Sequence, residues 1–582
     1  MQNKTKDDFK KSKKINKTVK KTLKQNKLNI LHDSSKEKVN LNNISKILLK
    51  NRNIKQEDEF NFFNPDFKNL LDPYLMPDMK KAVDRILEAK EKGERVVVFW
   101  DYDVDWVSST ALLSSFLRDM WIKVSYRLPH RAKDGYGLKK YFIDELKELK
   151  VALIITVDCW TRDIDVIKYS KEKNIDIIIT DHHAVPDVIP EEAVAIVNPK
   201  RKDNTYPFDK LAWAWVAFKL IQALAKEITK KEWREQEGYE EIEKELVMKY
   251  IDFASLWTVA DCMPLVWENR LITQLWLKQM KYSKSPALIK LTKDLDILNW
   301  ETIWFQIWPR INACWRLDTP YKALKMLLAS EENVDNILRE VEELNNERKE
   351  ITLIFLEQAL SEIDSSKAVI TWYSETISHW IIGLIAGRIT EMYNKPCIVL
   401  TKWNGKMTAS CRSPEYFSIV DALTHCDRFM IAYWRHKQAA WFSILDKDFE
   451  EFEKTIQEYA LNKTKDIDKT KVITIDSGLY LDLINIELLD EIDKLEPFWM
   501  GNPRPVFILK DCIVDRIEFL WQWEKHLKFI LEEAWFSIIW FWLWEFREKL
   551  LENKTLSFIW TLSRNIWMWN VSVQFMIKDI SF

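Results

Sequence analysis

The chain has 582 residues, enough for about three or four domains. Its near-balanced charge, 87 Lys and Arg against 89 Asp and Glu, excludes a uniformly basic nucleic-acid binder. Its 7 cysteines are scattered without a CxxC pair, which excludes a zinc ribbon or disulfide scaffold and indicates a reducing compartment. No apolar run is long enough to span a bilayer and no signal peptide is evident, so we expect a cytoplasmic protein without a membrane partner.

Glycine is scarce and tryptophan abundant, with 9 Gly and 29 Trp, whereas a globular protein usually contains about 7% glycine. Many tryptophans occupy turns typical of glycine, as in VDCW, ACWRL and PFWMGNP. We infer that the natural protein has glycine at many of these sites, through a genetic code that reads UGA as glycine. We expect glycine at positions 100, 106, 160, 213, 315 and 499. The alternative, a Trp-rich stacking surface, does not explain the missing glycine.

The N-terminal part divides into a tail and a helical segment. Residues 1–40 begin with a stretch that is rich in lysine and poor in apolar residues, which predicts a basic disordered tail. The alternative is a tail that binds nucleic acid weakly through its charge. Residues 41–94 predict short helices that are interrupted by proline.

Strands and helices alternate from residue 95. The expected strands are 95–99, 123–128, 151–157 and 175–180, and the expected helices are 107–120 and 141–149 with another before 175. This alternation predicts an α/β domain, 95–265, with a parallel sheet covered on both faces. The remaining segments are connecting helices over 266–366, a smaller α/β domain over 367–460 and a small β-barrel over 461–582.

Candidate ligands follow the predicted strands, where functional groups of parallel sheets gather. They are Asp101, Asp103 and Asp105 after the first strand, Asp158 after the third, Asp181, His182 and His183 after the fourth, and Asp261 after a later helix. Oxygen ligands with one or two imidazoles suit Mn²⁺ or Mg²⁺, and so many carboxylates favour two cations. Each motif alone is weak, since a DxDxD loop is often a solvated turn or calcium site and a His pair is often structural. Together they favour a two-metal phosphoesterase.

The motifs DYDVDW (with Trp106 read as Gly), VDC, DHH and SLWTVAD are similar, in order and spacing, to the four motifs of the DHH phosphoesterase superfamily. Within it, residues from about 45 to 582 resemble the RecJ family of single-strand-specific 5′→3′ exonucleases. The segments HRAKDGYGL, WPRINACWRL, CRS, WRHKQAAWFSI and PFWMGNPRPVF carry this resemblance. It implies an α/β fold: a DHH domain joined by long helices to a DHH-associated domain, followed by an OB-like β-barrel.

The resemblance also implies roles for individual residues. Two Mn²⁺ or Mg²⁺ ions would be held by Asp101, Asp103, Asp105, Asp158, His182 and Asp261. The catalytic residues would be Asp158, His182 and His183, with Asp158 between the two ions. Substrate would be bound by Arg131, Arg310, Ser410, Arg412 and His436. One departure is Arg435, where the family has the second glycine of a Gly-Gly-His motif. The implied partners are single-stranded DNA, a single-strand-binding protein and a RecQ-like helicase.

Two other functions and one other residue role remain open at this point. A small-substrate DHH enzyme would cut oligonucleotides or cyclic dinucleotides, but it would not need the C-terminal segment. An inactive DHH scaffold is disfavoured because every metal-site position is filled. Arg310 and Arg412 could form surface or interdomain ion pairs instead of binding phosphate.

Overall fold

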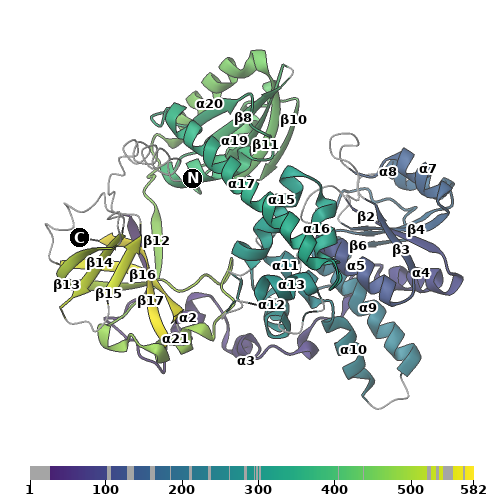
Figure 1. Ribbon diagram of the computed structural model, residues 1–582, viewed down its shortest axis with the longest axis horizontal. Helices are drawn as coiled ribbons and strands as arrows, with labels where there is room; N and C mark the ends of the chain where they lie inside the picture. The colour runs from purple at the N-terminus through teal and green to yellow at the C-terminus, as the bar shows by residue number, and fades with distance from the viewer. Residues whose placement is uncertain are drawn as a thin grey trace. The chain divides into compact units, whose positions relative to one another are not determined.

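The computed structural model describes residues 26–581 except 101–106, 128–136, 158–163, 184, 209–210, 212, 234–237, 261–262, 281–282, 284, 294, 296–298, 301–302, 404, 437, 521–525, 533–536, 542–554 and 568–569 (Figure 1). The chain divides into two compact units. Unit 1 contains Glu343–Ile473, and unit 2 contains Ile30–Glu342 and Thr474–Phe582. The six segments expected from the sequence are a finer division, which stays a prediction.

Unit 2 contains the predicted parallel sheet, with five strands in the order β3-β2-β4-β5-β6. The strands are β2 (Arg95–Trp100), β3 (Lys123–Arg127), β4 (Val151–Val157), β5 (Asp176–Thr180) and β6 (Ala195–Val197). Counted along the chain, this is the order 2-1-3-4-5 of doubly wound sheets, whose topology reverses between the first and third strands. The switch point therefore lies between β2 and β4.

Helices cover both faces of this sheet. The helices α7 (Lys140–Glu148) and α8 (Ile164–Glu172) lie on one face, where Phe142 and Ile167 pack into a core with Val97 and Ile177. Figure 1 shows α4 (Met79–Lys92), α5 (Val107–Asp119) and α9 (Trp213–Trp233) on the opposite face. Burial on both faces explains why these strands are continuous apolar runs rather than alternating ones.

Further helices of unit 2 surround the sheet or precede it. They are α2 (Ile44–Asn51), α3 (Glu59–Phe63), α10 (Tyr239–Met248), α11 (Ile251–Ala260), α12 (Trp267–Gln279), α13 (Pro286–Thr292), α15 (Trp308–Leu317) and α16 (Pro320–Leu327). A buried ion pair links α9 to α12, because Lys219 Nζ donates to Glu268 Oε1 at 2.5 Å. The same Nζ donates to the Leu71 carbonyl, in the segment before α4, at 2.8 Å. Within the described part of the chain, no helix is sufficiently long and apolar to cross a membrane.

The C-terminal part of unit 2 is a mostly antiparallel sheet. Its strands are β12 (Val472–Gly478), β13 (Phe507–Leu520), β14 (His526–Leu531), β15 (Ser537–Phe541), β16 (Thr555–Trp567) and β17 (Asn570–Ser581). A further strand, β1 (Lys27–His32), lies beside β12. The predicted disordered tail is therefore wrong for these residues. Their order depends on pairing with a strand some 440 positions later, as shown by the Lys27 amide, which donates to the Lys471 carbonyl at 3.1 Å.

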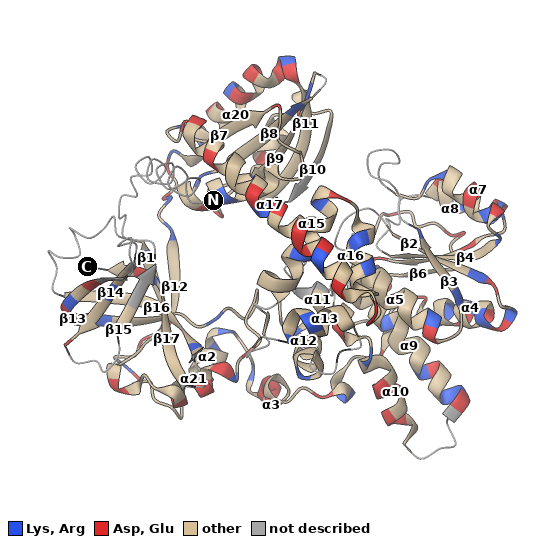
Figure 2. Ribbon diagram, in the orientation of Figure 1, with Lys and Arg blue, Asp and Glu red and all other residues tan. Residues whose placement is uncertain are grey.

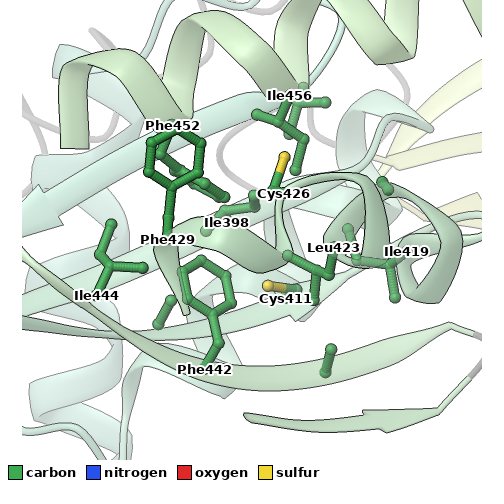
Figure 3. Close-up of a cluster of buried hydrophobic side chains, with 14 of the residues drawn as sticks. Ile398, Cys411, Ile419, Leu423, Cys426, Phe429, Phe442, Ile444, Phe452 and Ile456 are labelled. Atoms are coloured by element: carbon green, nitrogen blue, oxygen red, sulfur yellow. The ribbon is translucent and has the colours of Figure 1, made fainter. Parts of the chain in front are cut away.

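Unit 1 contains a second five-stranded sheet in the order β10-β11-β9-β8-β7. Its elements are α17 (Val334–Glu362, which begins in unit 2), β7 (Ile370–Ser374), α18 (Ile382–Tyr393), β8 (Cys397–Trp403), β9 (Lys406–Arg412), α19 (Ile419–His425), β10 (Ala432–His436), β11 (Ala439–Leu445) and α20 (Phe449–Thr464). Figure 3 shows the core between the sheet and α19 and α20, where Phe442 packs against Phe452 and Cys411 belongs to the same buried cluster. Acidic and basic residues are interspersed along α17 (Figure 2), as in an exposed helix.

Two tryptophans have the left-handed backbone that favours glycine. Trp121 has φ 61° and Trp267 has φ 49°, and their relative exposures are 90% and 70%. Trp121 ends α5: its amide donates to the Arg118 carbonyl, and the Ile122 amide donates to the Leu117 carbonyl, both at 2.9 Å. After α4, Gly93 has φ 62° and the equivalent two bonds. The same helix-ending motif thus carries Gly at one site and Trp at the other.

The six sites where the sequence predicts glycine differ from Trp121 and Trp267, because none of those that the structure describes has a left-handed backbone. Positions 106 and 160 lie outside the described residues, and neither Trp100, Trp213, Trp315 nor Trp499 has a positive φ. At those four positions, therefore, the backbone conformation gives no reason to expect glycine. Trp100 and Trp499 instead have a buried indole N–H with no hydrogen-bond partner among the described residues, which is unfavourable. The replacement of glycine at these positions stays a prediction.

Candidate active site

The carboxyl ends of β2, β4 and β5 are level with one another at the switch point. Trp100 pairs with Val157, and Val157 pairs with Thr180. Adjacent strands are about 4.8 Å apart, so the segments that follow the three strands begin within about 10 Å of each other. The residues that follow the three ends are Asp101, Asp158 and Asp181. The register thus brings the strand ends that precede the predicted acidic loops to one edge of the sheet.

Most of the predicted metal ligands lie outside the described residues, as does one predicted phosphate contact. They are Asp101, Asp103, Asp105, Asp158, Asp261 and Arg131. Among the residues that the structure does describe, no three metal-binding side chains are grouped. The described member of the predicted ligand set is His182.

His182 has the protonation state that a metal ligand needs. Its side chain is buried, and its Nδ1 lies 3.0 Å from the Leu211 carbonyl oxygen. A carbonyl only accepts, so Nδ1 carries the proton and Nε2 keeps its lone pair. Burial also lowers the pKa of His182 to about 3, which keeps the imidazole neutral. A neutral nitrogen beside several carboxylates fits a divalent cation such as Mn²⁺ or Mg²⁺.

His183 is oriented by the aspartate that precedes the pair. Its Nδ1 lies 2.9 Å from Asp181 Oδ1, which also accepts the backbone N–H groups of His182 at 2.8 Å and His183 at 3.1 Å. From the end of β6, Asn198 Nδ2 donates to the His183 carbonyl at 3.1 Å. The sequence predicts Asp181 as a candidate ligand and predicts no role for Asn198, whose only signal is its place after a short strand. Both hold the histidine loop in position.

Arg310 on α15 is already ion-paired. Its Nε lies 2.6 Å from Glu342 Oε2, and Nη1 donates to the Gln306 carbonyl. Arg310 thus forms the ion pair that the sequence analysis considers as an alternative to phosphate binding. Recognition of a 5′-phosphate by Arg310 stays a prediction, and the phosphate would have to replace Glu342 as its partner. The residues before α15 form a π-helical turn, Ile303–Ile307, a feature frequent at functional sites.

In unit 1, Ser410 and Arg412 lie on β9 and flank Cys411. Side chains alternate along a strand, and Cys411 enters the core shown in Figure 3, so its two neighbours face α18. A Cβ on Gly383 of α18 would lie 3.0 Å from Ser410 Oγ and 3.6 Å from Arg412 Nη2. Glycine therefore lets the start of α18 lie against both residues.

Arg412 has no ion pair with a described acidic residue. Its Nη1 donates to the Cys411 carbonyl at 2.7 Å and lies 3.5 Å from Ser410 Oγ. Burial lowers the pKa of the Arg412 guanidinium. A largely buried guanidinium without a carboxylate is suited to an anionic ligand such as phosphate.

The predicted nucleotide-holding motif continues on the neighbouring strands. His436 on β10 pairs with Ala439 on β11, which pairs with Arg412 on β9. Two strand spacings, about 10 Å, therefore separate the backbones of His436 and Arg412. Arg435 pairs with Ala440, so the departure from the family motif lies within the same hairpin. Contact of His436 with nucleotide stays a prediction.

Comparisons with known proteins agree with this arrangement. The family model "DHH family, N-terminal domain" matches residues 95–251, and "RecJ OB domain" matches residues 475–579. In both segments the chain is therefore similar to the RecJ family of the DHH superfamily. It is 29% identical over 530 residues to the single-stranded-DNA-specific exonuclease RecJ of Bacillus subtilis and 27% identical over 492 residues to that of Escherichia coli. The alignments cover 89% and 80% of this chain, and 65% and 83% of the two relatives.

Solved RecJ structures confirm the fold. The structure of RecJ from Thermus thermophilus with Mn²⁺ superposes with a TM-score of 0.79 at 23% identity, covering 96% of this chain and 79% of that one. An exonuclease RecJ bound to manganese gives a TM-score of 0.56 at 27% identity, covering 68% of this chain and 98% of that one. The predicted α/β fold with a parallel DHH sheet and a C-terminal OB domain is confirmed, and closure of a barrel is not established.

Proposed function

We propose that this protein hydrolyses single-stranded DNA from its 5′ end and releases 5′-mononucleotides, using two divalent cations in a DNA repair or recombination process. The level register of Trp100, Val157 and Thr180 carries the proposal, because Asp101, Asp158 and the segment 181–183 directly follow these three strand ends. The relatives' description as single-stranded-DNA-specific exonucleases supports the same substrate.

The neutral state of His182 and the carboxylates that follow the neighbouring strands fit Mn²⁺ or Mg²⁺. When bound, two such ions supply Lewis acidity and lower the pKa of water near the phosphodiester. The residues that would hold them are Asp101, Asp103, Asp105, Asp158, His182 and Asp261.

The chain's own residues would orient the substrate. His183, fixed by Asp181 and Asn198, would contact the scissile phosphate. Ser410 and Arg412 would hold the nucleotide through its phosphate, because Arg412 presents a planar donor group that has no carboxylate partner among the described residues. Arg131, Arg310 and His436 are further proposed contacts. The OB domain would bind the rest of the strand, as OB folds do through stacking and charge.

The test is digestion of a 5′-labelled single strand, a matching duplex and a dinucleotide, each with Mn²⁺ and with a chelator. We expect metal-dependent digestion of the single strand alone. Digestion of the dinucleotide alone would instead indicate a small-substrate DHH enzyme, and no digestion at all would indicate a scaffold. The assay is run on the chain as printed and on a chain with glycine at the suspect positions, because we expect the first to be poorly active.

The surroundings of the enzyme follow from the same proposal. We place it in the cytoplasm, and we expect a single-strand-binding protein and a RecQ-like helicase as partners. Co-purification of the tagged protein with either one would support these assignments.

A further inference from the structure

A turn of the C-terminal part lies directly on the loop that follows Asp261. This turn, residues 499–502, precedes β13, and the loop, residues 263–266, precedes α12. The Leu265 amide donates to the Met500 carbonyl at 2.7 Å, and Leu265 is fully buried. The loop therefore has a direct backbone bond to a segment more than 230 positions away.

Gly501 makes this approach possible. Its φ of +81° is in the left-handed region, and an added Cβ would lie 3.0 Å from Val266 Cγ1 and 3.1 Å from Pro264 Cβ. Both distances are tighter than ordinary van der Waals contact. A side chain at 501 would therefore force the side chains of Val266 and Pro264 to shift by a few tenths of an ångström.

The turn is itself held firmly. Asn502, which is 2% exposed, donates from Nδ2 to the Leu495 carbonyl at 2.8 Å and to the Pro497 carbonyl at 2.9 Å. From α12, Arg270 donates to the Glu496 carbonyl at 2.8 Å, and its guanidinium lies 3.6 Å from the centre of the Phe62 ring. The turn that contacts the loop is therefore hydrogen-bonded to residues 495–497, which are in turn bonded to α12.

We propose that the 499–502 turn positions the loop after Asp261, so that the C-terminal part of the protein sets the affinity of the metal centre. Gly501 and Met500 are positioning residues in this proposal, which rests on the proposed function because it takes Asp261 to be a metal ligand. The spacing supports the effect: two residues separate Asp261 from Pro264, and a displaced support of a ligand typically costs about 10–100-fold in metal affinity.

The test compares Gly501→Ala with Gly238→Ala by calorimetric titration of Mn²⁺ without DNA. Gly238 has φ +88° and no atom of the described residues within 4 Å of an added Cβ, so its variant carries the same kind of backbone strain in the same unit without the collision. We expect Gly501→Ala to weaken Mn²⁺ binding about tenfold and Gly238→Ala to leave it close to the parent. Equal binding by the two variants would overturn the proposal.

Two additional variants distinguish an error in the positioning role of Gly501 from an error in the metal assignment of Asp261. If Gly501→Ala does not fold, Gly501→Ala combined with Val266→Ala replaces it. This variant removes the contact at 3.0 Å and keeps the one with Pro264 Cβ at 3.1 Å, so we still expect weaker Mn²⁺ binding than in Gly238→Ala. Asp261→Ala tests the metal site itself. If Asp261→Ala binds Mn²⁺ normally, the metal assignment in the proposed function is wrong. If Asp261→Ala weakens binding and the Gly501 variants do not, only the positioning role is wrong.

Discussion

Replacement of Trp121 tests whether this site requires glycine. Trp121 has φ 61° and is 90% exposed, so its side chain has little packing to lose. We compare Trp121→Gly with Trp121→Ala, which differ only by the Cβ. A left-handed conformation costs an L-residue about 1–2 kcal/mol, whereas glycine adopts it freely. Glycine also loses about 0.5–1 kcal/mol more backbone entropy than alanine on folding, so the free energy of unfolding should be about 1 kcal/mol higher for the glycine variant.

The control site is Trp403, which is also exposed, at 79%, but has ordinary strand geometry in β8. There glycine should be less stable than alanine by about 0.5–1 kcal/mol. Urea unfolding of the four variants, followed by circular dichroism, measures both differences. The reasoning predicts opposite signs at the two sites. An alanine variant as stable as the glycine variant at position 121 would refute it.

The other predictions concern the genetic code and the substrate. Most Trp codons should be UGA, and peptides from the natural source should carry glycine at 100, 106, 160, 213, 315 and 499; UGG codons there would rule this out. Asp158→Ala should abolish nuclease activity but keep single-strand binding in a filter assay, because binding rests on arginine contacts and the OB domain; normal turnover would place the metal centre elsewhere. Arg412→Ala and Arg310→Ala should slow digestion of 5′-phosphorylated strands more than of 5′-hydroxyl strands, by about tenfold, the worth of one charged hydrogen bond. An equal loss on both strands would remove these arginines from end recognition.

The elements of the DHH sheet could be predicted closely from the sequence. The strand expected at 151–157 coincides with β4, and the helix expected at 107–120 with α5 (Val107–Asp119). These strands are buried on both faces, so their apolar runs are unambiguous. The edge strand β6 was missed because only three residues, Ala195–Val197, form it. The strand β1 was missed because its pairing partner β12 is distant in the chain.

Motifs in the sequence predict the candidate site residues, whereas contacts that depend on packing have no such signal. The strands that Asp101, Asp158 and Asp181 follow end level with one another, as the parallel topology predicts. The ion pair of Arg310 with Glu342, by contrast, joins two helices whose contact no local pattern reveals. The supports of the histidine loop at Leu211 and Asn198 are a backbone carbonyl and a lone amide, neither of which has a distinctive sequence signature.

The direction of digestion tests the central claim most directly. A single strand with a 5′-phosphate and a label on its 3′ end is incubated with the enzyme and Mn²⁺, and the labelled products are resolved over time. The account predicts labelled fragments that shorten progressively, with labelled mononucleotide appearing only at the end. Labelled mononucleotide in the first time points would show digestion from the 3′ end and would contradict the proposed function.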